Sequence, residues 1–358
     1  MTGTLRVIDS GVTEGRLNIA LGQALIEQHR AGKTPDTLRF LRFPPTALIG
    51  RHQALSQEVD LEYCRKNRVA TARRMTGGGA IYLDPGQLGW ELLVRRSRLG
   101  GKDLTDAARA ICEAAAAGLR QLGVDARFRP RNDIEVNGRK LGGTGGFFDG
   151  DTLFFQGTVL VDLDPKLMVS ALKVPRAKLE KRELDSAEQR VVTLKELLAE
   201  RCPEMDKIQS ALVEGFKTGL GVAVETAELD RDTRTLAGQL YDEEIGGDEF
   251  VNEIEHPGDE AGVLAGEHTG PGGTVRTYLR LQGPGQSRIA SALITGDFFV
   301  TPPRVIYDLE GALRGLPLAQ LSGTLACFFQ NANIEVLSVQ KEDFLKSLQA
   351  AVDAGGAA

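Results

Sequence analysis

The chain has 358 residues, of which 42% are hydrophobic and 26% charged, so its composition is that of a folded protein and excludes intrinsic disorder. Its length predicts two domains. The formal net charge of −6 argues against a general binder of nucleic acids or anionic membranes. The first residues have neither the basic nor the apolar region of an export signal, and no long apolar run follows, so we expect a cytoplasmic protein.

Helices and strands alternate irregularly in the first 125 residues. The apolar spacing of residues 16–29 predicts an amphipathic helix, and residues 38–50 are typical of two strands joined by a Pro-Pro turn. After these we expect a short helix at 60–67 capped by Asp60, strands at 69–74 and 87–96, and a long helix at 104–124.

Two hairpins are predicted in residues 133–164. Asn137-Gly138 and Asp149-Gly150 are preferred dipeptides of two-residue turns, and a long, mostly apolar strand covers residues 152–164. Antiparallel hairpins together with covering helices favour an α+β fold with a mixed or antiparallel sheet over a doubly wound parallel sheet.

The rest of the chain predicts a boundary and a second domain. Residues 165–190 are rich in Lys and Arg and are expected to be mobile with some helix, and helices resume at 195–221. Residues 241–260 hold nine acidic residues and several glycines, which favours a linker. We therefore predict a catalytic domain at 1–228, an acidic, glycine-rich linker region at 229–273, and a small α+β accessory domain at 274–352.

The first candidate site is RRMTGGGAIYLDPGQ, residues 73–87. Three adjacent glycines allow main-chain N–H groups to turn toward an anion, and Arg73 or Arg74 could bind a phosphate or a carboxylate. The segment is not a Walker loop, because no Lys followed by Ser or Thr comes after the glycines. A glycine-rich turn with a surface pair of arginines is an equally open interpretation at this point.

The second candidate site is GRKLGGTGG, residues 138–146. Lys140 follows a tight turn and precedes four glycines, an arrangement suited to holding a phosphate or a developing oxyanion, although a solvated lysine is the simpler alternative. Just before it, Asp133 could hold a metal-bound phosphate or pair with an arginine, or it could cap a strand together with Asn132.

The cysteines and histidines predict no further chemistry. Cys64, Cys112, Cys202 and Cys327 are dispersed and none is near either glycine cluster in sequence, which disfavours a thiol nucleophile. The four histidines lack metal-ligand spacing, so we expect no zinc site.

These motifs resemble, in order and spacing, those of the lipoate-protein ligase A family, within the biotin/lipoate ligase and octanoyltransferase superfamily. The resemblance rests on residues 73–92, 132–146 and 154–164 and covers residues 5–200, and residues 230–335 look more weakly like the accessory domain of two-domain ligases. It implies that lipoate and ATP give lipoyl-AMP and pyrophosphate, with Mg²⁺. A lysine of an acceptor, such as an apo lipoyl domain or a glycine-cleavage-H-like protein, then attacks the adenylate.

The resemblance also implies roles for particular residues. Lys140 would contact both the lipoyl carboxyl and the α-phosphate. Asn132 and Asp133 would face the phosphates and Mg²⁺. The remaining lipoate- and nucleotide-binding residues would be Arg74, Thr76, Gly77, Gly78, Gly79, Ala80, Ile81, Tyr82, Gly143, Thr144 and Gly145.

Two positions differ from the family pattern. Leu83 and Gln156 stand where many members have histidines, so the substrate preference, including any use of octanoate, is open. One alternative is an octanoyl or lipoyl transferase that works through a cysteine thioester, and a biotin ligase matches the motifs less well. Another is a non-catalytic lipoate-binding protein that docks carriers, although Lys140 and Arg74 argue against it.

Overall fold

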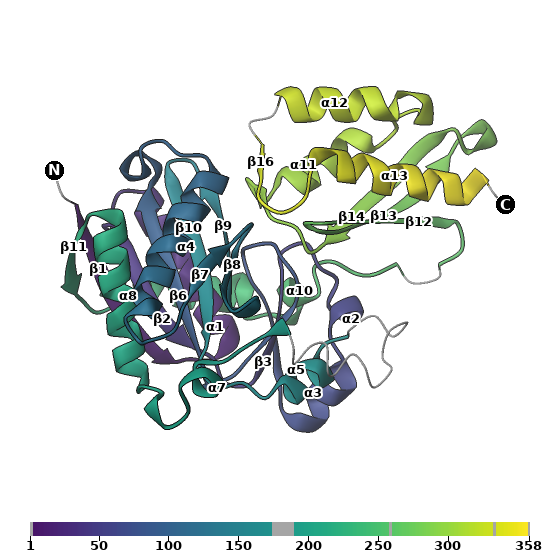
Figure 1. Ribbon diagram of the computed structural model, residues 1–358. Coiled ribbons are helices and arrows are strands. Elements are labelled where there is room, and N and C mark those ends of the chain that lie inside the picture. The colour runs from purple at the N-terminus through teal and green to yellow at the C-terminus, as the bar shows by residue number, and fades with distance from the viewer. Residues whose placement is uncertain (1–2, 174–189, 258–259, 332–333, 357–358) are drawn as a thin grey trace.

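The computed structural model describes residues 3–173, 190–257, 260–331 and 334–356 (Figure 1). Its main element is an eight-stranded mixed sheet with the strand order β11-β1-β2-β6-β10-β9-β8-β7. Strand β1 pairs in parallel with β2 and β11, and the other pairs are antiparallel. In that order the strands span Ala223–Thr226, Thr4–Val12, Thr37–Arg42, Gln87–Arg95, Thr152–Leu160, Arg139–Asp149, Asp133–Val136 and Arg127–Arg129.

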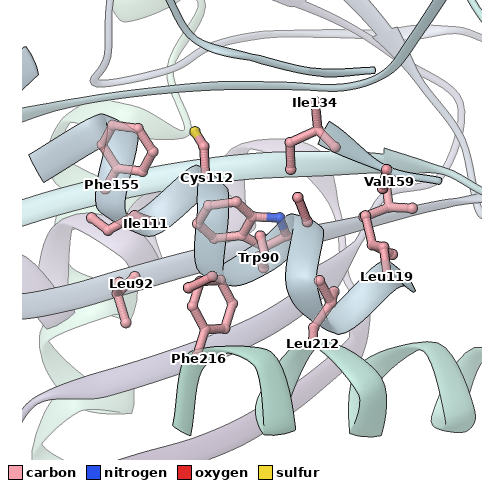
Figure 2. Packing of buried hydrophobic residues seen from close by; sticks show 14 of the residues in the cluster. Trp90, Leu92, Ile111, Cys112, Leu119, Ile134, Phe155, Val159, Leu212 and Phe216 are labelled. Atoms are coloured by element: carbon pink, nitrogen blue, oxygen red, sulfur yellow. The ribbon is translucent and has the colours of Figure 1, made fainter. Parts of the chain in front are cut away.

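Helices cover both faces of this sheet. Helices α4 (Leu104–Arg120) and α8 (Met205–Leu220) pack on one face, where Trp90 is fully buried and its ring centroid lies 5.2 Å from that of Phe216 (Figure 2). Helix α1 (Gly15–Arg30) covers the opposite face. The sequence predicted α1 because its apolar residues recur at helical spacing, and it also predicted α4 and helical structure in the region of α8.

A smaller sheet stands beside the first. It has the order β4-β3-β5, with strands at Ala70–Arg73, Thr46–Ile49 and Ile81–Leu83. Around it lie α2 (Leu55–Glu58), α3 (Leu61–Asn67) and α5 (Pro165–Ala171). Helix α7 (Leu194–Leu198) follows later in the chain. The predicted cap of α3 is confirmed, since the Asp60 side chain accepts a hydrogen bond from the Tyr63 N–H.

Both predicted hairpins are present. Strands β8 and β9 are joined at Asn137-Gly138, where both residues adopt positive φ, as a tight hairpin turn requires. Strands β9 and β10 are joined at Asp149-Gly150. These two hairpins place Lys140 and the second glycine cluster on β9, between β10 and β8 in the large sheet.

Residues 263–356, which we call the C-terminal unit, have a separate core. Strands β12 (Val263–Gly270), β13 (Gly273–Gln282) and β14 (Arg288–Gly296) form an antiparallel sheet. This sheet and its helices bury their own apolar cluster. The remaining elements are β15 (Val300–Thr301), α11 (Val305–Leu313), α12 (Leu321–Asn331), β16 (Glu335–Val336) and α13 (Lys341–Gly356).

The segment predicted as a linker contains regular structure. Helix α9 (Arg231–Leu240), a π-helical turn at Tyr241–Ile245 and α10 (Asp248–Val251) pack on α1 and β4. Their acidic side chains are mostly exposed, whereas Ala237, Ile245 and Phe250 are buried. The acidic composition favoured a linker, whereas the segment forms helices that pack on the protein through a few buried apolar residues. The domain division at residues 228 and 273 stays a prediction.

Most of the basic segment expected to be mobile lies outside the described residues, apart from α5 and its ends. Among the described helices, none combines the length and apolar character needed to cross a bilayer.

Candidate active site

A cavity of about 380 Å³ lies between the two sheets and the C-terminal unit. Its polar end is lined by Lys140, Asp133 and Asn132, and its apolar section by Ile19, Leu41, Phe43, Leu48 and Leu83. The C-terminal unit contributes Gly272, Asp297, Phe299 and Ser338. Both sequence motifs therefore reach one cavity, together with residues from segments to which the sequence assigned no site.

Lys140 forms an ion pair with Asp133 at the polar end. The Lys140 Nζ lies 2.7 Å from Asp133 Oδ1, and the Arg129 Nη2 lies 2.7 Å from Asp133 Oδ2. The Lys140 side chain remains 37% exposed, so it is accessible from the cavity. Of the alternatives considered for Asp133, the structure has the carboxylate paired with an arginine and with Lys140 itself.

Asn132 is bound to the glycine-rich strand β9. Its Nδ2 donates to the Thr144 carbonyl at 2.5 Å, and its own carbonyl accepts the Thr144 N–H and hydroxyl, each at 2.8 Å. These three hydrogen bonds fix the loop before β8 against Gly143, Thr144 and Gly145, which line the cavity. Asn132 lines the cavity too, but one N–H of its side-chain amide is already donated to the Thr144 carbonyl.

Arg74 and Arg73 bind main-chain carbonyls. Arg74 donates to the carbonyls of Leu48, Gly77 and Gly79, and is 4% exposed. Burial lowers its pKa to about 9, so it stays charged at neutral pH. Arg73 is fully buried and donates to five carbonyls, those of Gly50, Arg51, Gln53, Phe250 and Val251. The two arginines thus shape the loops, and neither is a surface residue as the alternative interpretation had it.

The first glycine loop divides into two parts. Gly79, Ala80, Ile81 and Tyr82 line the cavity, whereas Thr76, Gly77 and Gly78 do not. Thr76 is buried and its hydroxyl accepts a hydrogen bond from Gln156 Nε2 at 2.9 Å. The Gly78 N–H donates to the Phe298 carbonyl at 3.0 Å. One main-chain donor of the predicted anion site is therefore bound to the C-terminal unit.

Phe299 fills the space between the two glycine segments. A Cβ placed on Gly78 would lie 2.5 Å from the Phe299 ring, and one on Gly145 would lie 2.0 Å from it. No side chain other than hydrogen fits at either position beside that ring. The absence of side chains at Gly78 and Gly145 therefore leaves space, and in this structure the Phe299 ring occupies it.

A buried ion pair adjoins the apolar section. Glu91 of β6 lines the cavity, and its Oε2 lies 2.7 Å from Arg39 Nη2 of β2. Glu91 is 3% exposed and Arg39 is fully buried. The sequence analysis missed both residues. A signal was available, because a charged residue in an otherwise apolar strand needs a partner or a function.

One cysteine lies beside the second glycine cluster, contrary to the expectation that no thiol is near either one. Cys112 Sγ is 3.2 Å from Thr144 Oγ1, because α4 packs beneath β9. The thiol is fully buried, and burial raises its pKa to about 12. A thiol with so high a pKa is a poor nucleophile. None of the described cysteines lines the cavity.

The chain matches the model of the lipoyl protein ligase A/B catalytic domain over residues 14–217. Octanoyltransferase LipM of Geobacillus kaustophilus is 30% identical over 270 residues, which cover 68% of this chain and 96% of that protein. Lipoate-protein ligase A subunit 1 of Thermoplasma acidophilum is 30% identical over 66% of this chain and 91% of its own length. The chain therefore belongs to the lipoyl protein ligase A/B family.

Lipoate-protein ligase LplJ of Bacillus subtilis matches a longer part of the chain. It is 26% identical over 345 residues, covering 95% of this chain and 98% of that protein. Its match therefore includes the C-terminal unit, which extends beyond the region matched by the catalytic-domain model.

Solved structures agree on the fold. The bipartite lipoate protein ligase of T. acidophilum, studied with its E2 lipoyl domain, has a TM-score of 0.64 at 28% identity, covering 72% of this chain and 98% of that one. A lipoate-protein ligase A bound with ATP has a TM-score of 0.61 at 27% identity, covering 71% and 100%. The predicted α+β, ligase-like fold is confirmed, and the protein is an enzyme of the lipoate ligase and octanoyltransferase group.

Proposed function

We propose that the protein is an ATP-dependent lipoate-protein ligase, which converts lipoate to lipoyl-AMP and transfers the lipoyl group to a lysine of a lipoyl carrier. The observation that carries the proposal is the position of Lys140, accessible at the polar end of a cavity whose other section is apolar. Such a cavity suits a ligand with an apolar acyl chain and an anionic head group.

In this mechanism Lys140 lies between two anions. Its ammonium group would contact the lipoate carboxylate and the α-phosphate of ATP, which reduces their repulsion as the carboxylate oxygen attacks phosphorus and pyrophosphate leaves. Asp133 orients Lys140 through the 2.7 Å contact. The acceptor lysine would then attack the acyl carbon, and AMP would leave.

The cysteines support adenylate chemistry over a thioester. The thiol beside Thr144 is buried and has a strongly raised pKa, and no described cysteine lines the cavity. Lipoate-protein ligase LplJ matches almost the whole chain, C-terminal unit included, and this match also supports a ligase.

ATP and lipoate are proposed as substrates by analogy with relatives, one solved with ATP and one from T. acidophilum with lipoic acid. Mg²⁺, when bound, would neutralise part of the triphosphate charge. It would be held mainly through the phosphates, because Asp133 already pairs with two cations and the described residues contain no group of three or more His, Cys, Asp or Glu arranged for a metal.

The proposed acceptor is an apo lipoyl domain, since the T. acidophilum ligase was studied with its E2 lipoyl domain. A glycine-cleavage-H-like acceptor and a cytoplasmic location remain further proposals.

An octanoyltransferase is the second candidate, because several similar relatives are LipM transferases. One experiment separates the two. The protein is incubated with apo lipoyl domains and either ATP, Mg²⁺ and lipoate, or an octanoyl carrier protein without ATP, and each domain is weighed by intact-mass spectrometry. Modification only in the ATP arm supports the ligase, and modification only in the carrier arm refutes it.

A further inference from the structure

The buried ion pair of Arg39 and Glu91 leaves one carboxylate oxygen open. Arg39 Nε donates to Glu91 Oε2 at 2.8 Å and its Nη2 lies 2.7 Å from the same oxygen. Within the described residues Glu91 Oε1 accepts no hydrogen bond, although Glu91 is 3% exposed and lines the cavity. The oxygen keeps some contact with the cavity, so it is open to a donor that a ligand supplies.

Some of the residues that line the cavity around Glu91 are apolar and are suited to contact an acyl chain. Ile19 and Leu41 line the same cavity, and the Glu91 carboxylate packs against Gly22 of α1, with Oε1 3.0 Å from where a Cβ on that glycine would be. The Glu91 carboxylate therefore brings a negative charge to a section lined by these apolar side chains and by Gln156.

The strand register places Glu91 at a defined distance from the polar end. Gly145 of β9 is opposite Gln156 of β10, and Gln156 is opposite Glu91 of β6. Because neighbouring strands are about 4.8 Å apart, Glu91 lies roughly 10 Å across the sheet from Gly145. Lys140 Nζ lies 2.7 Å from where a Cβ on Gly143 would be, two residues before Gly145 on the same strand. An extended octanoyl or lipoyl chain whose carboxyl is held by Lys140 therefore has about the length needed to reach Glu91.

We propose that Glu91 selects acyl groups whose far end carries a hydrogen-bond donor, and that the preferred acid is dihydrolipoate rather than octanoate. This inference rests on the proposed function for the direction in which the chain lies. The thiols of dihydrolipoate can donate to Glu91 Oε1, whereas the methyl end of octanoate cannot and the disulfide of oxidised lipoate offers only weak acceptors. A ligand whose apolar end covers this oxygen without supplying a donor displaces water from it and therefore loses affinity.

The test measures dissociation constants for octanoate, oxidised lipoate and dihydrolipoate by calorimetry without ATP, the last kept reduced under anaerobic conditions. Wild-type protein should bind dihydrolipoate about tenfold more tightly than octanoate. Glu91→Leu alone would leave Arg39 buried without a partner, so the informative variant is the pair Arg39→Met with Glu91→Leu, in which the preference should disappear or reverse. The matched control is Lys195→Met with Asp162→Asn, an exposed ion pair outside this cavity.

Equal or tighter binding of octanoate by wild-type protein, or a preference unchanged in the Arg39 and Glu91 double variant, overturns the inference. If the double variant does not fold, as judged by circular dichroism, Glu91→Gln replaces it and should weaken the preference. The ATP-dependent formation of acyl-AMP from the same acids tests the proposed function separately, since it can fail while the binding preference holds.

Discussion

The ring of Phe299 occupies the space beside Gly145 that any larger residue at that position would need, with Phe299 Cε1 only 2.0 Å from the site of a Cβ. Gly145 belongs to β9 and Phe299 to the C-terminal unit. The pair therefore joins the glycine-rich strand to a segment more than 150 residues later.

Gly145→Ala should lower the free energy of unfolding by about 1 to 3 kcal/mol, because the added methyl overlaps the ring. Combining it with Phe299→Ala should recover part of that loss, since the overlap is removed. Urea denaturation of the two single variants and the double variant gives the coupling energy. Simple additivity of the two effects would show that the contact is absent in solution.

Lys140→Ala should reduce lipoyl-AMP formation by about 100-fold or more, because a cation at the reacting carboxylate and phosphate is lost. The fold should be kept, since the side chain is partly exposed and its ion pair is with Asp133. Pyrophosphate release is the measurement, and Lys195→Ala, which removes an exposed lysine, is the control. A rate within about threefold of wild type would refute the assigned role.

Replacing all four cysteines by Ala should leave ligation largely intact. Adenylate chemistry needs no thioester, and the thiol nearest the second glycine cluster, Cys112, is buried with a raised pKa. Intact-mass spectrometry of the modified acceptor measures the outcome. Isolation of an acyl-enzyme on Cys64, Cys112, Cys202 or Cys327 that passes its acyl group to the acceptor would favour the transferase instead.

Arg73→Lys should destabilise the protein by about 3 kcal/mol. The guanidinium bonds five buried carbonyls, and an ammonium group with three donors leaves some of them without a partner. Chemical denaturation measures the change, and Arg127→Lys, an exposed residue on β7, should have little effect. A comparable loss in both variants would mean that the main-chain bonds of Arg73 are not responsible.

His52 should make the protein less stable in acid. Burial, with Arg51 and Arg73 nearby, lowers the pKa of His52 to about 3, while an unfolded histidine titrates near pH 6.5. The unfolded chain therefore binds a proton between these pH values that the folded chain does not. The stability that His52 contributes is complete above pH 6.5 and is lost progressively as the pH falls toward 3.

The corresponding variant is His52→Phe, which keeps an aromatic ring against Phe298, whose centroid is 5.1 Å from that of His52. Its thermal midpoint should fall less than that of wild type between pH 7.5 and pH 4.5. His268→Gln is the control, because that ring is partly exposed. Parallel losses in wild type and His52→Phe would contradict the prediction.

Local chemistry made much of the fold predictable. The Asn137-Gly138 turn, the Asp60 cap and the long helix containing Cys112 each depend on residues adjacent in sequence. The position of Lys140 followed from its turn. Helices in the acidic segment were missed because their many exposed carboxylates outnumber buried residues such as Phe250.

The partners of the site residues were harder to predict. A glycine-flanked arginine can bind an anion or a carbonyl, and Arg74 binds carbonyls. Phe299 and Glu91 line the cavity because segments far apart in the sequence pair and pack against each other. The spacing of residues within a motif does not predict such contacts. The nearness of Cys112 to Thr144 depends on how α4 packs beneath β9, and this too is a tertiary relationship.

The pairing of the first strand affects how the protein emerges from the ribosome. Thr4 of β1 is opposite Ala223 of β11, so one edge of this strand has no partner until more than half of the chain has been translated. An exposed strand edge can pair with another nascent chain. Slower elongation between these two strands should therefore lengthen the period of aggregation risk, and fusions that delay the arrival of β11 should reduce the yield of correctly folded protein.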